Sequence, residues 1–243
     1  MSESGNAHVA PLDESTDSAP SRILSRRQTK LSHMANGNDY LVWVDCEMTG
    51  LDVAIDEIVE IAVIITDSNL VPRHEGLSLV IKPSEAALNN MGDFVREMHT
   101  NSGLINELDG GLPLAEAETL VLEYLAEHVP EGHRAPLAGN TIGTDRMFVA
   151  RYMPRFDNAL HYRNIDVSSL KELARRWFPR VYFNAPSKDG NHRALADIIE
   201  SIRELEYYRR AMLTPEPGLS SDEAAKIAEA VTAEYVAALG ADS

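Results

Sequence analysis

Tyr40-Leu-Val-Trp-Val-Asp-Cys-Glu-Met-Thr-Gly-Leu51 is an apolar run that ends in two carboxylates two residues apart. In a β-strand the side chains alternate between faces, so Asp45 and Glu47 project from one face, roughly 7 Å apart along the chain, and Cys46 from the other. Two like charges on a hydrophobic strand are costly unless a counter-charge neutralises them, and the usual one is a hard cation with oxygen ligands. A solvated strand edge is the alternative, but the apolar run favours a buried strand. The stretch therefore predicts a metal site.

Composition indicates a protein with one main core. The 243 residues, 44% of them hydrophobic, can bury one substantial core. No apolar run reaches membrane-spanning length, and the N-terminus lacks the basic and apolar regions of a signal peptide. The single cysteine excludes an internal disulfide and a thiolate zinc site. We expect a cytoplasmic protein that does not bind membranes.

The net charge of -16 restricts the kind of nucleic acid that the chain can hold. A protein that binds long nucleic acid non-specifically neutralises many phosphates with Lys and Arg. This chain has 22 such residues against 38 acids. We therefore expect no binding of long polymers, while a short substrate held by metal ions and a few side chains stays compatible with the charge.

The ends of the chain differ in composition from its middle. Residues 1–37 are rich in Ser, Asp, Pro and Asn and lack apolar periodicity, and Met34 is an alternative to Met1 as the translation start. Thr214-Pro-Glu-Pro-Gly218 interrupts the helical pattern, and an alanine-rich helix pattern follows at 221–239. We predict three parts, a disordered tail at 1–37, a folded domain at 38–213 and an acidic, alanine-rich helical extension at 214–243.

The folded part begins with strand patterns and continues with strands alternating with helices, which predicts an α/β fold. Strands are predicted at 40–46, 58–66, 77–82, 136–139 and 162–166. Short turns between the first three strands indicate an antiparallel meander. Ser169 with Glu172 three residues later matches a capping box, which predicts a helix start. The other predicted helices are 84–90, 115–128, 145–153, 193–212 and 221–239.

Two further acids and one histidine have positions suited to a metal site. Asp145 follows a strand and a turn of small residues; such an aspartate is most often favoured by the helix dipole, yet near a strand end it can also become a metal ligand. Asp197 lies at the edge of the apolar stripe of the 193–212 helix and can point toward the sheet. His192 follows Ser187–Asn191 and taken alone is a surface histidine. With the acids it predicts a mobile general base.

These motifs occur in an order that resembles a known family. Asp45-x-Glu47, Asp145 and His192-x4-Asp197 resemble the three motifs of the DEDDh 3′-to-5′ exonucleases of the RNase H-like superfamily. The sequences around them resemble the oligoribonucleases over approximately residues 38–213. The resemblance implies an RNase H-like mixed sheet flanked by helices, here with a C-terminal extra helix.

The resemblance also implies a chemistry. Two divalent cations about 4 Å apart activate water and neutralise charge on the phosphate. Mg²⁺ or Mn²⁺ suits an all-oxygen site. The resemblance assigns His192 as the base that accepts a proton from the attacking water. Asp45 is expected to bridge the ions, and the four carboxylates that bind them are Asp45, Glu47, Asp145 and Asp197.

The substrate expected from the resemblance is a two-nucleotide RNA. Leu51 matches a leucine that wedges between the two bases, and Phe94 stands where relatives often carry a stacking tryptophan, with His99 in the same loop. Tyr162 aligns with a tyrosine that the second subunit of a homodimer contributes. Taken singly, Leu51 and Phe94 are equally compatible with core positions and Arg163 with a surface charge. The polar cap on the 5′-phosphate matches Thr141, Arg163 and Ser168.

Three other functions remain open at this point. A DEDDh exonuclease for longer RNA or DNA would need a basic surface, which the composition disfavours. A non-catalytic nucleic-acid-binding module would be expected to lack a carboxylate or the histidine, and all five are present. A regulatory module built on the acidic tail and the 221–239 helix is the third alternative.

Overall fold

The computed structural model describes residues 40–187 and 193–240, with side chains described as far as residue 238. Packing divides the chain into Met1–Asn36 and Gly37–Ser243, and every described residue belongs to the second unit. The tail predicted at the N-terminus and the predicted base His192 lie outside the described residues. The predicted division into three parts therefore stays a prediction.

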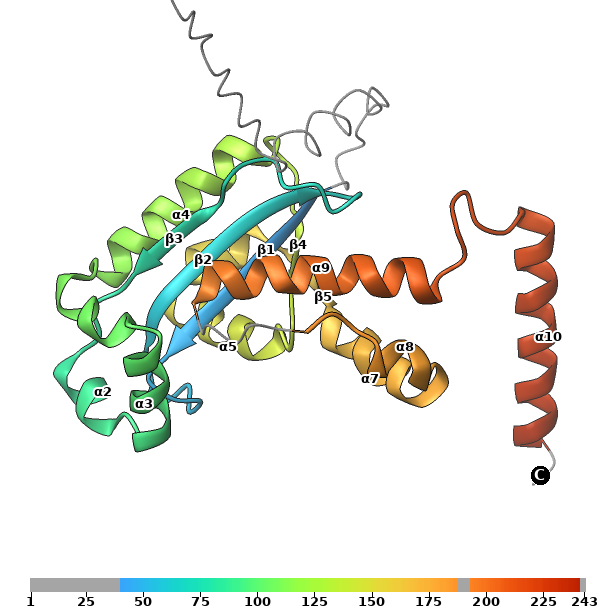
Figure 1. Ribbon diagram of the computed structural model, residues 1–243. Helices are drawn as coiled ribbons and strands as arrows, with labels where there is room; N and C mark the ends of the chain where they lie inside the picture. Colours follow the sequence, from blue (N-terminus) through green and yellow to red (C-terminus); the bar gives the residue numbers. More distant parts are fainter. Residues whose placement is uncertain (1–39, 188–192, 241–243) are drawn as a thin grey trace, which may run out of the picture. The chain divides into compact units, whose positions relative to one another are not determined.

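One five-stranded mixed sheet forms the centre of the described part (Figure 1). Its spatial order is β3-β2-β1-β4-β5. The pairs β1–β2 and β2–β3 are antiparallel, whereas β1–β4 and β4–β5 are parallel, so the predicted meander and the mixed sheet are confirmed. The strands are β1 (Tyr40–Met48), β2 (Ile58–Asp67), β3 (Leu77–Val80), β4 (Pro136–Gly139) and β5 (His161–Asp166).

Helices pack on both faces of the sheet. Those that the sequence predicted agree with the structure to within about two residues, apart from the start of α7. The α-helices are α2 (Glu85–Asn90), α3 (Asp93–Asn101), α4 (Leu114–His128), α5 (Gly143–Tyr152), α6 (Pro154–Ala159), α7 (Val167–Trp177), α8 (Pro179–Phe183), α9 (Ala194–Met212) and α10 (Ser221–Gly240), and two short 3-10 turns are η1 (Leu104–Asn106) and η2 (Leu108–Gly110). None of the helices in these ranges is long and apolar enough to cross a membrane.

Alternation along β1 separates two hydrophobic clusters. Val44 and Cys46 pack into one cluster with α4, α5 and α6, whereas Trp43 packs into the other with α7 and α9. Because successive side chains of a strand point to opposite faces, Asp45 and Glu47 share the face of Trp43. The two carboxylates therefore share one face, as the strand pattern predicted, and helix α9 packs on that face.

Helix α7 begins earlier than the sequence suggested. The capping box of Ser169 and Glu172 was wrong, because Asp166 is the N-cap and its side chain accepts a hydrogen bond from the backbone N–H of Ser168. The hydroxyl of Ser169 donates to the same carboxylate at 2.9 Å, and Glu172 pairs with Arg176 instead. Asp at an N-cap satisfies the free N–H groups of the first turn, so it competes directly with a serine three residues later.

The segment that carries Phe94 and His99 is a helix and not a loop. Helix α3 runs from Asp93 to Asn101 and follows Gly92, which offers no side-chain cap. The weak N-terminal signal explains why the sequence pattern did not predict it. The helix places Phe94 on an exposed side and buries His99 completely.

Candidate active site

Three carboxylates from two elements converge on one face of the sheet. Ligand oxygens of Asp45 and Glu47 on β1 and Asp197 on α9 all lie within 4.8 Å of one another. Glu47 is buried and the other two are half-buried. The sequence placed all three in the metal site, and the structure brings them together.

Asp145 lies beside this group on α5. Its Oδ1 accepts a hydrogen bond of 3.0 Å from the backbone N–H of Cys46, the residue between the two β1 carboxylates. Burial raises the pKa of Asp145 to about 7, and the bond from Cys46 opposes that rise. Its role as a fourth ligand stays a prediction.

The electrostatics of the group favour a bound cation. Burial raises the pKa of Glu47 to about 8, and the charges of Asp197, Glu60 and Asp145 add to the rise. Burial, followed by the charges of the surrounding acids, also holds the pKa of the Cys46 thiol well above its usual range. Carboxylates that repel one another in a desolvated site are stabilised by a hard cation, which oxygen ligands suit. The donor set therefore fits a divalent metal, and sulfur is excluded as a ligand because Cys46 packs into the opposite cluster.

A second buried acid lies next to Glu47, and the sequence analysis missed its role. Glu60 is 1% exposed and interrupts the apolar run of β2. The guanidinium of Arg193 donates to both oxygens of Glu60 at 3.1–3.2 Å and to Glu107 at 2.8 Å. Arg193 is the residue before α9 and the residue after His192. A charge within an otherwise apolar strand was the available signal, because such a charge needs a partner.

An apolar cavity opens next to the carboxylates. Its volume is about 250 Å³, and Glu47, Leu51 and Phe94 are among the residues that line it, with Met98 on the same helix as Phe94. Leu51 is 75% exposed and Phe94 is 80% exposed. Large apolar side chains that stay this exposed beside a charged site indicate a binding surface. The structure therefore brings these two predicted substrate residues to the same cavity.

Hydrogen bonds to Asp56 brace the loop that carries Leu51. The buried carboxylate of Asp56 accepts hydrogen bonds from the Thr49 hydroxyl at 3.0 Å and from the Asp52 N–H at 2.9 Å. A Cβ atom at Gly50 would lie 2.4 Å from this carboxylate, so a larger residue there would displace the Asp56 side chain. The brace holds the backbone of the loop in place while the Leu51 side chain extends outward.

His99 is not among the residues that line the cavity. The ring is fully buried; Nε2 lies 2.8 Å from the backbone oxygen of Met48, and Nδ1 lies 3.8 Å from Oε2 of Glu47. Such a histidine orients the end of β1 and its carboxylate. Direct contact with substrate stays a prediction.

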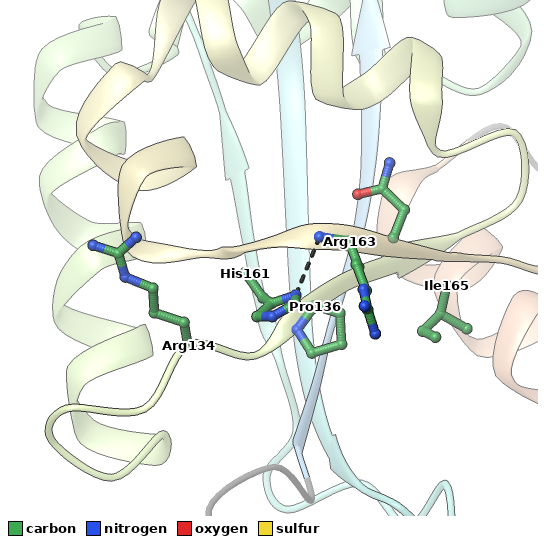
Figure 2. A pocket seen from close by; sticks show the side chains of 6 residues that line it. Arg134, Pro136, His161, Arg163 and Ile165 are labelled. Carbon is green, nitrogen blue, oxygen red and sulfur yellow. Dashed lines mark hydrogen bonds between the residues drawn. The ribbon is translucent and has the colours of Figure 1, made fainter.

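The residues expected at the 5′-phosphate divide into two places. Thr141 and Ser168 meet, with their hydroxyl oxygens 3.0 Å apart and the Thr141 N–H donating to Ser168 Oγ at 2.9 Å. Arg163 lines a cavity of about 260 Å³ along β4 and β5 with Arg134 and His161 (Figure 2).

Tyr162 lies on the outermost strand of the sheet. It is 73% exposed on β5, and the Arg163 guanidinium lies 5.4 Å from its ring centre. An exposed tyrosine on an edge strand fits a residue that reaches another subunit.

Known proteins resemble this chain over most of its length. Residues 42–205 match the exonuclease family RNase_T. The chain is 62% identical over 207 residues to the oligoribonuclease of Leifsonia xyli, a match that covers 85% of this chain and 100% of that one. It is 56% identical to the oligoribonuclease of Streptomyces coelicolor (84% and 100% covered) and 55% identical to that of Mycobacterium tuberculosis (78% and 88% covered).

Solved structures of the same fold are more distant. Exonuclease I from Methylocaldum szegediense superposes with a TM-score of 0.52 at 23% identity, and E. coli exonuclease I in complex with a dA16 oligonucleotide with a TM-score of 0.56 at 17% identity. Each match covers 72% of this chain but spans only 41% of the solved chain. These likenesses confirm the predicted fold.

Proposed function

The chain belongs to the oligoribonuclease family of exonucleases, and from this we propose that it hydrolyses short oligoribonucleotides, especially 5′-phosphorylated dinucleotides, to nucleoside 5′-monophosphates. The observation that carries the proposal is the cavity in which exposed Leu51 and Phe94 adjoin the Glu47 carboxylate. The cavity offers apolar surface for bases directly beside the acids that would act on the phosphodiester. Apolar side chains recognise any base through its face, which suits an enzyme without sequence preference.

For the cofactor we propose two divalent cations, Mg²⁺ or Mn²⁺, held by Asp45, Glu47, Asp145 and Asp197. When bound, such ions supply Lewis-acid activation of water and neutralise charge on the phosphate and the leaving oxygen. The close grouping of Asp45, Glu47 and Asp197 supports this assignment. The hydrogen bond that Asp145 accepts from the backbone between the two β1 carboxylates supports its inclusion.

His192 is proposed as the residue that accepts a proton from the attacking water. It lies outside the described residues, but its neighbour Arg193 is fixed by Glu60 and Glu107 immediately before α9. Since Asp197 stands on the first turn of that helix, the proposed base is tied by the chain to a proposed metal ligand.

For substrate recognition we propose that Leu51 wedges between the two bases and Phe94 stacks on one of them. Thr141, Ser168 and Arg163 would bind the 5′-phosphate. The proximity of the two hydroxyls supports this, because the exposed Thr141 hydroxyl can turn its proton from Ser168 to a phosphate oxygen.

We also propose a homodimer in which Tyr162 completes the site of the partner. The exposure of this tyrosine on an edge strand supports the proposal, because most of its side chain is open to contact by a second subunit. Sedimentation of the purified chain would measure the oligomeric state, and a monomer would contradict the assignment of Tyr162.

The test of the activity is product analysis on 5′-phosphorylated RNAs of two to about ten nucleotides, with Mg²⁺ and with excess chelator. We expect metal-dependent conversion of the dinucleotide to monophosphates, with the longer chains cleaved more slowly. Equal or faster trimming of the longer chains would identify a general exonuclease instead. Absence of cleavage at every length would favour a binding module.

A further inference from the structure

Thr141 has a backbone conformation that a β-branched residue rarely adopts. Its φ is +53°, in the left-handed region. Such strain persists only where surrounding contacts hold it. Here the Thr141 N–H donates to Asp166 Oδ1 at 3.0 Å and to Ser168 Oγ at 2.9 Å, which ties the loop after β4 to the start of α7.

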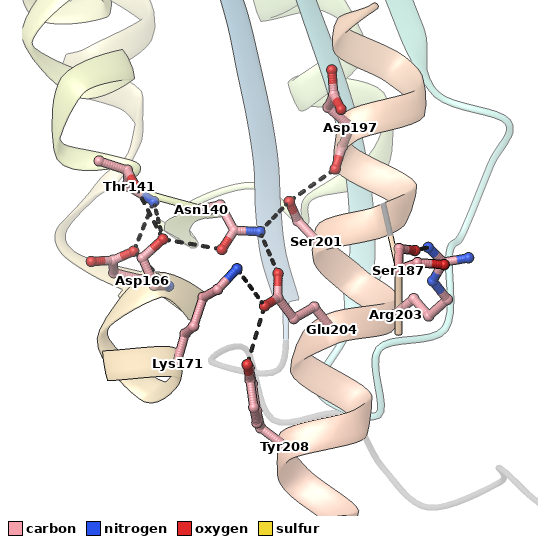
Figure 3. Close-up of polar contacts among 11 residues, drawn as sticks. Asn140, Thr141, Asp166, Lys171, Ser187, Asp197, Ser201, Arg203, Glu204 and Tyr208 are labelled. Carbon is pink, nitrogen blue, oxygen red and sulfur yellow. Dashed lines mark hydrogen bonds and ion pairs between the residues drawn. The ribbon is translucent and has the colours of Figure 1, made fainter. Parts of the chain in front are cut away.

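Asn140 connects this loop to helix α9 (Figure 3). Its amide Nδ2 donates to Ser201 Oγ at 2.8 Å and to Glu204 Oε2 at 3.1 Å, while its Oδ1 accepts from Ser168 Oγ at 3.1 Å. The Ser201 hydroxyl donates its proton to the backbone oxygen of Asp197 at 2.8 Å, so toward Asn140 it can only accept.

The number of protons on each group determines which atom donates and which accepts in these hydrogen bonds. A reversed Asn140 amide would place its oxygen against the Glu204 carboxylate, so the amide has one orientation. The Ser168 proton is then committed to Asn140, and the hydroxyl contact with Thr141 must have Thr141 as its donor. The network therefore runs from Thr141 through Ser168 to Asn140, where it divides toward Ser201 and toward Glu204.

Glu204 is the buried end of the network. It is 4% exposed, and it also accepts from the Tyr208 hydroxyl at 3.2 Å and pairs with Lys171 at 3.3 Å. Lys171 stands on α7 and Glu204 on α9, so their ion pair adds a second connection between the helices that the network joins. Buried polar groups that are fully hydrogen-bonded make a rigid connection.

We propose that Asn140 and Glu204 are positioning residues that set the spacing between the carboxylate group and the Thr141–Ser168 loop, and thereby the substrate length. The inference rests on the proposed function, in which the loop binds the 5′-phosphate and Asp197 binds metal. One end of the network holds the loop. At Asn140 one branch bonds the backbone of Asp197 through Ser201, and the other bonds Glu204, which fixes the orientation of the Asn140 amide. A fixed spacing admits one nucleoside between the cleaved phosphodiester and the 5′-phosphate.

The test compares kcat/KM for a 5′-phosphorylated dinucleotide and tetranucleotide in Glu204→Gln and Asn140→Asp. Glu204→Gln keeps the side-chain volume but offers a donor, which permits the Asn140 amide to reverse. We expect the dinucleotide-to-tetranucleotide ratio to fall at least about tenfold in each, the lower end of the value of one hydrogen bond to a charged group. Tyr207→Phe is the matched control, because it removes a 2.8 Å bond from α9 to Val181 outside the network.

The ratio of the two kcat/KM values distinguishes a loss of positioning from a loss of folding. A variant that is partly unfolded loses activity on both substrates equally, so its ratio stays that of the wild type. An unchanged ratio in both folded variants would overturn the inference while leaving the proposed function intact. A wild-type enzyme without preference for the dinucleotide would instead overturn the proposed function.

Discussion

Glu47 and Glu60 stand directly opposite each other in the antiparallel β1–β2 pair. Like charges at such positions destabilise a sheet, and both side chains are buried here. Arg193 offsets the charge of Glu60 and opposes the rise in the Glu47 pKa that burial and the neighbouring acids cause. The strand pair therefore depends on a residue 133 positions away from Glu60.

Arg193→Gln should destabilise the fold. Removing one partner of a buried pair leaves an uncompensated charge, which costs about 3–5 kcal/mol when both groups are buried. The Arg193 side chain is 33% exposed, so we expect a smaller loss of about 2 kcal/mol in the free energy of unfolding by urea.

Arg209→Gln is the control for that loss. The Arg209 side chain is also 33% exposed, but its partner Glu206 is 19% exposed against 1% for Glu60. We expect a change of less than about 1 kcal/mol there. Adding Glu60→Gln to Arg193→Gln should recover part of the loss, and an equal loss in the two arginine variants would contradict the role of Arg193 as a counter-charge.

Stability without metal should fall as the pH rises. The pKa of Glu47 is raised from 4.5 to about 8 and that of Asp145 from 3.8 to about 7 in the folded chain. At a pH between its unfolded and its folded pKa, each group is protonated more often in the folded chain than in the unfolded chain. The folded state therefore loses stability as the pH rises through that window.

Melting temperatures measured in chelator between about pH 6 and 8 would check this. Mn²⁺ should raise the melting temperature more at the upper end, because metal competes with protons for the carboxylates. A melting temperature in chelator that rises with pH across the window would contradict the raised pKa values.

His192→Ala should lose turnover and keep binding. Loss of a general base costs about 10²- to 10⁴-fold in kcat, while the dissociation constant of a dinucleotide should stay close to that of the wild type. Wild-type activity should rise from mildly acidic to alkaline pH as the base loses its proton. His74→Ala is the control, since His74 stacks on His128 and takes no part in the proposed site. Unimpaired turnover in His192→Ala would reject the assignment.

The sequence predicted that Asp45, Glu47 and Asp197 converge because the information for this is local. Alternation in β1 places Asp45 and Glu47 on one face, and the apolar stripe of α9 orients Asp197 toward that face. Both patterns are read within one element. The RNase H-like resemblance supplied the mixed sheet flanked by helices, while the order of its strands came from the structure, because periodicity does not fix it.

What the sequence could not predict depends on contacts between distant segments. Glu60 meets Arg193 across 133 positions and His99 meets Met48 across 51. Contacts between residues so far apart in the sequence leave no periodic pattern in it. Helix α7 was misplaced for a local reason, since Asp166 and Ser169 are both good caps and only the structure shows which one is used.

Phe94 and Leu51 should contribute to binding more than to chemistry. Both are exposed in the cavity beside Glu47, and stacking on one base is worth about 1–3 kcal/mol. Phe94→Ala and Leu51→Ala should therefore raise KM for a dinucleotide about tenfold or more, with kcat changed less than about twofold. Phe94→Trp should lower KM, because a larger ring covers more of the base.

Ile55→Ala is the control: Ile55 is 55% exposed on the same braced loop but lies outside the residues that line the cavity. Equal effects in Ile55→Ala and Leu51→Ala would show that the loop, and not the wedge, determines KM.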